Sequence, residues 1–127
     1  MKYLLDTHIV LWYFRGAKEL SKTVKSIIED ADTQKYVSVA SLWDFAIKHS
    51  QGKLQFDGGF SHLLEMLTKN GFVILPITTS HLTGIIHLSF IHRDPFDRLL
   101  VAAAKTEGMT ILTADENIHQ YEVSTMW

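Results

Sequence analysis

Five aspartates stand where short apolar segments end or where helical patterns begin: Asp6, Asp44, Asp94, Asp97 and Asp115. Carboxylates crowded into one place repel one another, and they stay ionised together only when a cation neutralises them. Oxygen ligands of this kind suit Mg²⁺ or Mn²⁺, and these ions usually act on phosphates. A water activated by the metal would attack phosphorus, while the metal stabilises charge on the attacking and leaving oxygens. If these side chains meet, they indicate hydrolysis at phosphate.

Two of these aspartates also suit structural roles at the start of one helical segment. Asp94 precedes Pro95, and aspartate before a proline at the first helical position is a preferred N-cap. Asp97 would occupy the third helical position, where a carboxylate interacts favourably with the helix dipole. The two are three residues apart, so they lie on one face of the helix.

The other three aspartates differ in how easily a structural role explains them. Asp115 could cap a short turn over 116–118, and Asp44 could pair with Lys48 four residues later. Asp6 ends an apolar strand and has no obvious partner. For the set as a whole, spacing alone leaves a metal site and these structural roles equally open.

The segments that must position these side chains alternate between short apolar runs and longer helical patterns. Strands are predicted at Tyr3–Leu5, Tyr36–Val39, Phe72–Leu75 and Met109–Thr113, with a weaker one at Tyr121–Thr125. Helices are predicted at Thr7–Phe14, Ser21–Ala31, Ser41–His49, Phe60–Lys69, Ser80–Leu88 and Pro95–Glu107. This alternation favours an α/β domain with a mainly parallel sheet, in which ligands bind beyond the carboxyl ends of the strands.

Length and composition favour one domain over residues 1–127 and exclude several functional classes. The chain has 127 residues, 46% of them hydrophobic, and a formal net charge of −2, which excludes a strongly basic nucleic-acid coat. Cysteine is absent, which excludes disulfides, thiolate zinc sites and cysteine nucleophiles and is compatible with the cytoplasm. No targeting segment is visible. The longest stretch without Asp, Glu, Lys or Arg is Asn70–His92, which is too polar for a membrane span, so no membrane association is expected.

The histidines and tryptophans give weaker signals. The seven histidines show no HExxH spacing, which disfavours zinc, and no glycine-rich phosphate loop is found. Three histidines lie near the loops that hold the aspartates: His8, His92 and His119. Surface or boundary positions are expected for His49, His62, His81 and His87, and core positions for Trp12 and Trp43.

Five blocks of sequence carry a family pattern that extends over essentially the whole chain. They are LLDTH at 4–8 with Leu11 and Trp12, VSVASLWD at 37–44, Lys48 with GKL at 52–54, HRDPFDRLL at 92–100, and LTAD at 112–115. The HRDPFDR block is the most specific of them. On these residues the chain resembles the PIN-domain proteins, in particular the VapC-like ribonuclease toxins of type II toxin–antitoxin systems.

This resemblance implies both a fold and an activity. The implied fold is a three-layer α/β/α PIN domain with a central, mainly parallel sheet of four to five strands. The implied activity is that of an endoribonuclease, dependent on Mg²⁺ or Mn²⁺, that hydrolyses RNA phosphodiester bonds and leaves 5′-phosphate and 3′-hydroxyl ends. A cognate antitoxin and a homodimer are the implied partners.

The resemblance also implies roles for particular residues. The family's catalytic carboxylates fall on Asp6, Asp44, Asp97 and Asp115, with Asp6, Asp97 and Asp115 as metal ligands. Supporting roles fall on the Thr113 hydroxyl and on Asp94. Binding of the substrate phosphate falls on Arg93 and Arg98.

One position departs from the family pattern. The second acidic residue is usually glutamate, whereas here Asp44 stands between Trp43 and Phe45. Aspartate keeps the charge but is one methylene shorter, so its contact with a metal could run through water. A catalytically weakened PIN-like module that binds RNA or protein is therefore the alternative function.

Two further classes that use aspartates at strand ends fit the sequence less well. A phosphatase of the haloacid dehalogenase type uses an aspartate nucleophile and needs a second aspartate two residues later, where this chain has His8. A receiver-like switch domain needs an acidic pair at the end of the first strand and a lysine after the fifth, and neither is convincingly present.

Overall fold

Five parallel strands form the centre of the fold. The computed structural model describes residues 1–127, and its sheet has the order β3-β2-β1-β4-β5 with every neighbouring pair parallel. The strands are β1 (Lys2–Leu5), β2 (Gln34–Ser38), β3 (Phe72–Leu75), β4 (Thr110–Leu112) and β5 (Thr125–Met126). The expected mainly parallel sheet of four to five strands is confirmed.

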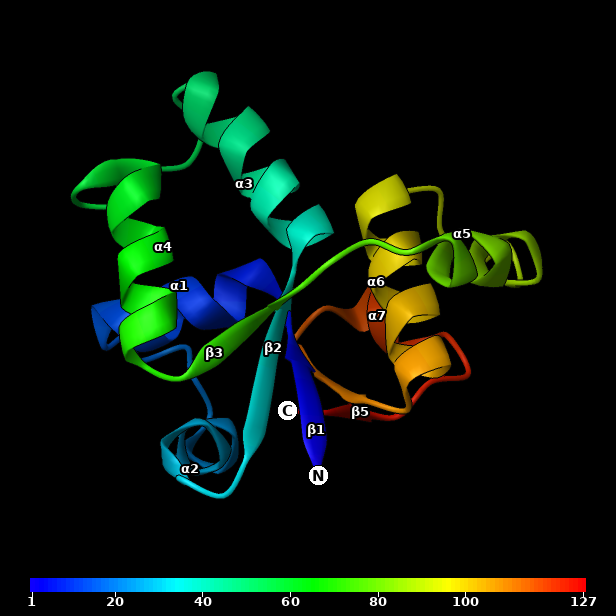
Figure 1. Ribbon diagram of the computed structural model, residues 1–127, viewed down its shortest axis with the longest axis horizontal. Helices are drawn as coiled ribbons and strands as arrows, with labels where there is room; N and C mark the ends of the chain where they lie inside the picture. The colour runs from blue at the N-terminus through cyan, green and yellow to red at the C-terminus, as the bar shows by residue number, and fades with distance from the viewer.

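Seven helices cover the sheet from both sides and complete a three-layer α/β/α arrangement (Figure 1). One side carries α1 (Thr7–Arg15), α2 (Lys22–Glu29), α3 (Val39–Ser50) and α4 (Gly59–Lys69). The other side carries α5 (Thr79–Ile86), α6 (Pro95–Glu107) and α7 (Glu116–His119). None of these helices is both long and apolar enough to cross a lipid bilayer.

Two apolar cores hold the three layers together, one on each face of the sheet. Successive residues of a strand point to opposite faces, so β1 contributes to both cores. Tyr3 and Leu5 join the core beneath α1 to α4, whereas Leu4 joins the core beneath α6 and α7. Burial on both faces is typical of a central parallel strand, and it explains why β1 is a continuous apolar run.

The order of the strands reverses next to β1. The chain adds β2 and β3 on one side of β1, and then β4 and β5 on the other side. Leu5 at the end of β1 pairs with Leu112 at the end of β4, so Asp6 and Thr113 follow side by side. In open parallel sheets, ligands bind beyond the strand ends at such a reversal.

Capping geometry confirms several of the predicted helix boundaries, and the other boundaries differ from the prediction by one or two residues. Ser21 accepts a hydrogen bond from the amide of Val24 at the start of α2, and Asp94 caps α6, in which Pro95 is the first residue. Gly16 and Gly108 end α1 and α6 in the left-handed conformation, with φ of 62° and 68°. Glycine adopts this conformation without the steric cost that a Cβ atom imposes.

One predicted strand and the predicted burial of two side chains are wrong. The last strand is Thr125–Met126 rather than Tyr121–Thr125, because Tyr121 is buried in a turn that follows α7 and its hydroxyl is bonded to the backbone of His92. Trp43 is 57% exposed instead of lying in the core. His81 is only 1% exposed instead of lying at the surface, because it bonds to Glu107 of α6.

Candidate active site

A hydroxyl group joins the ends of the two strands at the reversal point. Thr113 Oγ1 donates a hydrogen bond of 3.0 Å to Asp6 Oδ2 and accepts one of 3.0 Å from the amide of Asp115. Thr113 itself is completely buried, whereas the side chain of Asp6 is 19% exposed. The arrangement fixes the Asp6 carboxylate relative to the loop that carries Asp115.

Three of the aspartates also cap helices. Asp6 Oδ1 accepts from the amide of His8 in α1, and Asp115 Oδ1 accepts from the amide of Asn117 in α7. Asp94 Oδ1 accepts from the amides of Phe96 and Asp97 in α6, at 2.9 and 3.3 Å. These caps, which the sequence indicated for Asp94 and Asp115, turn the three carboxylates toward helix N-termini, where the dipole favours negative charge.

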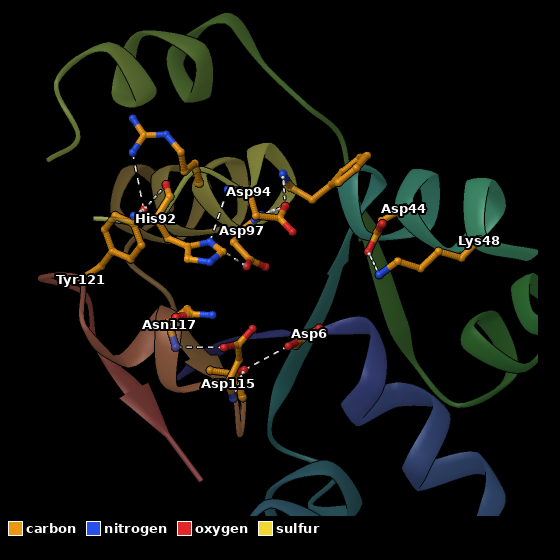
Figure 2. A network of polar contacts seen from close by, with 12 residues as sticks. Asp6, Asp44, Lys48, His92, Asp94, Asp97, Asp115, Asn117 and Tyr121 are labelled. Atoms are coloured by element: carbon orange, nitrogen blue, oxygen red, sulfur yellow. Dashed lines mark hydrogen bonds and ion pairs between the residues drawn. The ribbon is translucent and has the colours of Figure 1, made fainter. Parts of the chain in front are cut away.

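Asp97 lies at the centre of the acidic group. It projects from the first turn of α6 toward the strand ends that carry Asp6 and Asp115 (Figure 2). Its pKa is raised from 3.8 to about 7, first because burial disfavours its charge and then because of the negative charges of four neighbours: Asp94, Asp115, Asp6 and Asp44. All five aspartates singled out in the sequence are thus near enough to interact electrostatically.

Asp44 has a cation of its own. Its Oδ2 is 3.0 Å from Lys48 Nζ, one helical turn away along α3, so the ion pair expected from the spacing is present. The side chains are 23% and 41% exposed respectively. Asp44 faces the other carboxylates from the α3 side (Figure 2), but part of its charge is already compensated.

No three of these side chains are gathered closely enough to share one metal ion. The metal set Asp6, Asp97 and Asp115 therefore stays a prediction. The chemistry of the donors nevertheless fits a hard divalent cation, since the group contains carboxylate oxygens and no thiolate. The raised pKa of Asp97 points the same way, because after burial its causes are the negative charges of four neighbouring aspartates, which a bound cation would offset.

The two arginines expected to bind phosphate occupy different environments. Arg98 donates hydrogen bonds to the backbone carbonyl oxygens of Ser89 and Ile85, and its guanidinium lies 4.8 Å from the centre of the Phe90 ring. These contacts hold the side chain of Arg98 against the end of α5 and the connection between α5 and α6. Arg93 is exposed and lines a groove of about 570 Å³ that also contains Asp44, Lys48 and Asp94.

Two residues near Asp97 were not assigned a role from the sequence. His92 Nδ1 accepts a hydrogen bond from the amide of Asp94 and lies 4.0 Å from Asp97 Oδ2. The Tyr121 hydroxyl accepts from the amide of His92 and donates to its carbonyl oxygen, at 2.9 and 3.0 Å. The position of His92 in the HRDPFDR block was a usable signal, whereas Tyr121 has none, because its partner is 29 residues away.

His8 lies on the other side of Asp6. Its Nδ1 is 3.9 Å from Asp6 Oδ1, and the pKa of His8 is raised, chiefly by its interaction with this carboxylate and against the opposing effect of burial. A second hollow of about 260 Å³ opens here, lined by Asp6, His8, Asp115 and Trp12 among others. The acidic group is thus accessible from two sides.

The sequence of the chain matches a known protein family over nearly its whole length. The family model for the PIN domain matches residues 3–123, so the chain belongs to the PIN domain family. Among curated proteins it is similar to Ribonuclease VapC22 of Mycobacterium tuberculosis, with 25% identity over 118 residues that cover 93% of this chain and 90% of that protein.

Solved structures show the same fold at low sequence identity. VapBC2 from Rickettsia felis, bound to a DNA fragment from its promoter, superimposes with a TM-score of 0.74 at 13% identity, covering 99% of this chain and 98% of the other. A toxin–antitoxin complex from Klebsiella pneumoniae gives 0.68 at 15% identity, and FitAcB from Neisseria gonorrhoeae gives 0.65 at 19%. Each of these two matches covers 98% of this chain and 96% of the other.

Proposed function

We propose that this PIN domain is an endoribonuclease that depends on Mg²⁺ or Mn²⁺ and hydrolyses phosphodiester bonds in RNA. The observation that carries the proposal is the position of Asp97 among four other carboxylates, with its pKa raised to about 7. Such crowding destabilises a folded protein unless a cation relieves it, so it is typical of a functional site. The similarity to a ribonuclease of the same family supports RNA as the substrate.

In this proposal Asp6, Asp97 and Asp115 hold the metal ion, and Thr113 and Asp94 support them. When bound, the ion supplies charge neutralisation and a water activated for hydrolysis. Thr113 orients Asp6 and the Asp115 loop through its two hydrogen bonds. Asp44, paired with Lys48, contributes negative charge at the α3 side, and the exposed Arg93 attracts the phosphates of the substrate.

We further propose that the protein is the toxin of a type II toxin–antitoxin pair. Two of the similar structures above are VapBC2 and a toxin–antitoxin complex, and this chain covers nearly all of each matched chain. A cognate antitoxin would then bind it, and the cytoplasm, where messenger and transfer RNA are found, would be its place of action. The homodimer that the family resemblance implies belongs to the same proposal.

The experiment is cleavage of a pool of RNA by the purified protein, titrated separately with Mg²⁺ and Mn²⁺. Asp97→Ala should abolish cleavage, whereas Asp32→Ala, in an exposed turn before β2, should cleave like wild type. Activity that survives Asp97→Ala would place the chemistry elsewhere. If wild type binds RNA but cuts none with either metal, the chain is a binding module instead of a nuclease.

A further inference from the structure

An exposed tryptophan stands directly beside the candidate active site. Trp43 precedes Asp44 in α3, and 57% of its surface is accessible to solvent. It contacts the ring of Phe96 edge to face, with centroids 5.1 Å apart and an angle of 80° between the rings. A contact of this geometry leaves at least one flat face of the indole uncovered by Phe96.

Phe96 connects this tryptophan to the groove described above. The groove of about 570 Å³ is lined by Phe96 and Pro95 together with charged and polar side chains, namely Asp44, Lys48, His92, Arg93 and Asp94. Phe96 also precedes Asp97, the central carboxylate, in the first turn of α6. The indole therefore stands at the edge of a groove that combines carboxylates with two cationic side chains.

This combination matches the chemistry of a single-stranded nucleic acid. Lys48 and Arg93 can attract phosphates, and none of the ion pairs in the structure involves Arg93. An exposed aromatic ring beside such a groove offers a surface on which any unpaired base, whether purine or pyrimidine, can stack. A base inside a duplex cannot use this surface without leaving its neighbours.

We propose that Trp43 is the stacking surface for one unpaired base of the RNA next to the cleaved phosphate. The inference rests on the proposed nuclease function and adds to it a residue that contacts a base of the substrate. Trp43 is a binding residue in this account, because it touches the substrate but not the reacting atoms. Phe96 acts through Trp43 by holding the indole against the groove.

A contact between protein chains is the competing explanation for this exposed side chain. Val39, one helical turn before Trp43, is 38% exposed and lies on the same side of α3. We favour RNA because the residues that line the groove beside Trp43 are mostly charged or polar, whereas the core of a protein interface is depleted of charge. The two explanations differ in what an abasic substrate and a molar-mass measurement would show.

The test uses single-stranded oligoribonucleotides that wild type cleaves, made in two forms. One form carries all its bases, and the other carries an abasic nucleotide at one position at a time around the cut. Kd is measured with Ca²⁺ and cleavage with Mg²⁺, for wild type, Trp43→Ala and Trp43→Phe. Ile86→Ala, which removes a 79% exposed apolar side chain outside the groove, serves as the control.

We expect Trp43→Ala to weaken binding and slow cleavage of the intact RNA by roughly tenfold, the effect typical of one lost stacking contact. Trp43→Phe should keep most of the activity, and Ile86→Ala all of it. At one abasic position wild type should fall to the level of Trp43→Ala, while Trp43→Ala loses nothing more. A base-paired version of the cut site should be cleaved more slowly by wild type.

Three results would overturn the inference. If Trp43→Ala equals wild type on intact RNA while wild type is active, the stacking role is wrong and the nuclease function stands. If Trp43→Ala lowers the molar mass measured by light scattering, or loses the same factor on every abasic substrate, Trp43 is a contact between chains or a structural residue. If wild type cleaves no RNA with either metal, the nuclease function itself fails and the inference fails with it.

Discussion

The hydroxyl of Thr113 lies 3.0 Å from Oδ2 of Asp6, so that the residues after β1 and β4 share one hydrogen bond across 107 positions of sequence. The same hydroxyl accepts from the amide of Asp115. A single buried side chain thereby sets the relative positions of two of the proposed metal ligands. Errors of about 1 Å in such positions are felt strongly in catalysis.

Replacing Thr113 with valine should therefore impair activity and stability together. The substitution keeps the shape but leaves the Asp115 amide and Asp6 Oδ2 without this partner, which should cost about 1–3 kcal/mol. We expect cleavage to fall at least tenfold, as measured with a labelled RNA under saturating metal. Thr113→Ser should restore most of it, because serine keeps the hydroxyl.

Thr110→Val is the matched control for this substitution. Thr110 is the first residue of β4, the strand that Thr113 follows, and it is nearly as well buried as Thr113. Its hydroxyl shares a hydrogen bond of 2.9 Å with the hydroxyl of Ser124, at the end of β4 away from the site. Its loss should cost about 1 kcal/mol and leave cleavage intact. Equal activity in both valine variants would show that the Thr113 hydroxyl does not position the site.

Two substitutions at Asp6 distinguish the role of this carboxylate as a helix cap from the effect of its negative charge. Asp6→Asn keeps an oxygen for the amide of His8 but removes a negative charge from the acidic group. In chelator it should melt at or above the wild-type temperature, and with Mg²⁺ or Mn²⁺ present it should cleave no RNA. Asp6→Ala also loses the cap, so its free energy of unfolding should fall below that of Asp6→Asn by about 1 kcal/mol. An Asp6→Asn variant that melts well below wild type would make Asp6 a structural residue.

Asp97 should give the metal-free protein a distinctive pH dependence. Its pKa in the folded protein, about 7, lies above its ordinary value of 3.8. Its contribution to stability is therefore fully present below about pH 4 and is lost as the pH rises through 7. Between pH 4.5 and 7.5 in chelator, the free energy of unfolding of wild type should fall relative to that of Asp97→Asn, which does not titrate.

The same pair of proteins tests metal binding without any nuclease assay. Mg²⁺ or Mn²⁺ that binds only the folded state raises its melting temperature in a concentration-dependent way. At pH 7.5 we expect a clear increase for wild type and a much smaller one for Asp97→Asn. Equal shifts in both proteins would mean that the ion binds at another place.

Asp44 stands where the family resemblance leads us to expect a glutamate. If the shorter side chain weakens metal contact, Asp44→Glu should raise activity, or lower the Mg²⁺ concentration needed, by roughly tenfold at most. The pairing with Lys48 works against a larger gain, since the lysine competes for the same carboxylate. Cleavage by Asp44→Ala that equals wild type would remove Asp44 from the site.

The end of the central strand β1 could be predicted from the sequence because two local features mark it, namely an apolar run and the aspartate that follows. A buried central strand is a continuous apolar run, and the aspartate that follows Tyr3–Leu5 marks its end. The caps of α6 and α7 were visible for the same reason. Spacing alone left open whether the five aspartates form one site, and the family pattern assigned four of them to it: Asp6, Asp44, Asp97 and Asp115.

The exposed position of Trp43 could not be predicted in this way. Helical periodicity identifies a stripe of apolar residues but not whether a neighbour covers it. Helix α3 packs against α1 on one side and α6 on the other, which leaves the strip with Trp43 open. His81 is the opposite case, since its burial depends on Glu107, 26 residues later in another helix. Contacts of this kind arise from the tertiary fold.

The central place of β1 has a consequence for synthesis of the protein. Asp6 is translated 107 residues before Thr113, which follows the neighbouring strand β4 and leads into the Asp115 loop. A nascent or prematurely terminated chain that stops before residue 110 carries Asp6 without Thr113 or Asp115. Such fragments would have no complete acidic group, so under the proposed function a cell would be exposed to nuclease activity only after Thr113 and Asp115 have been translated.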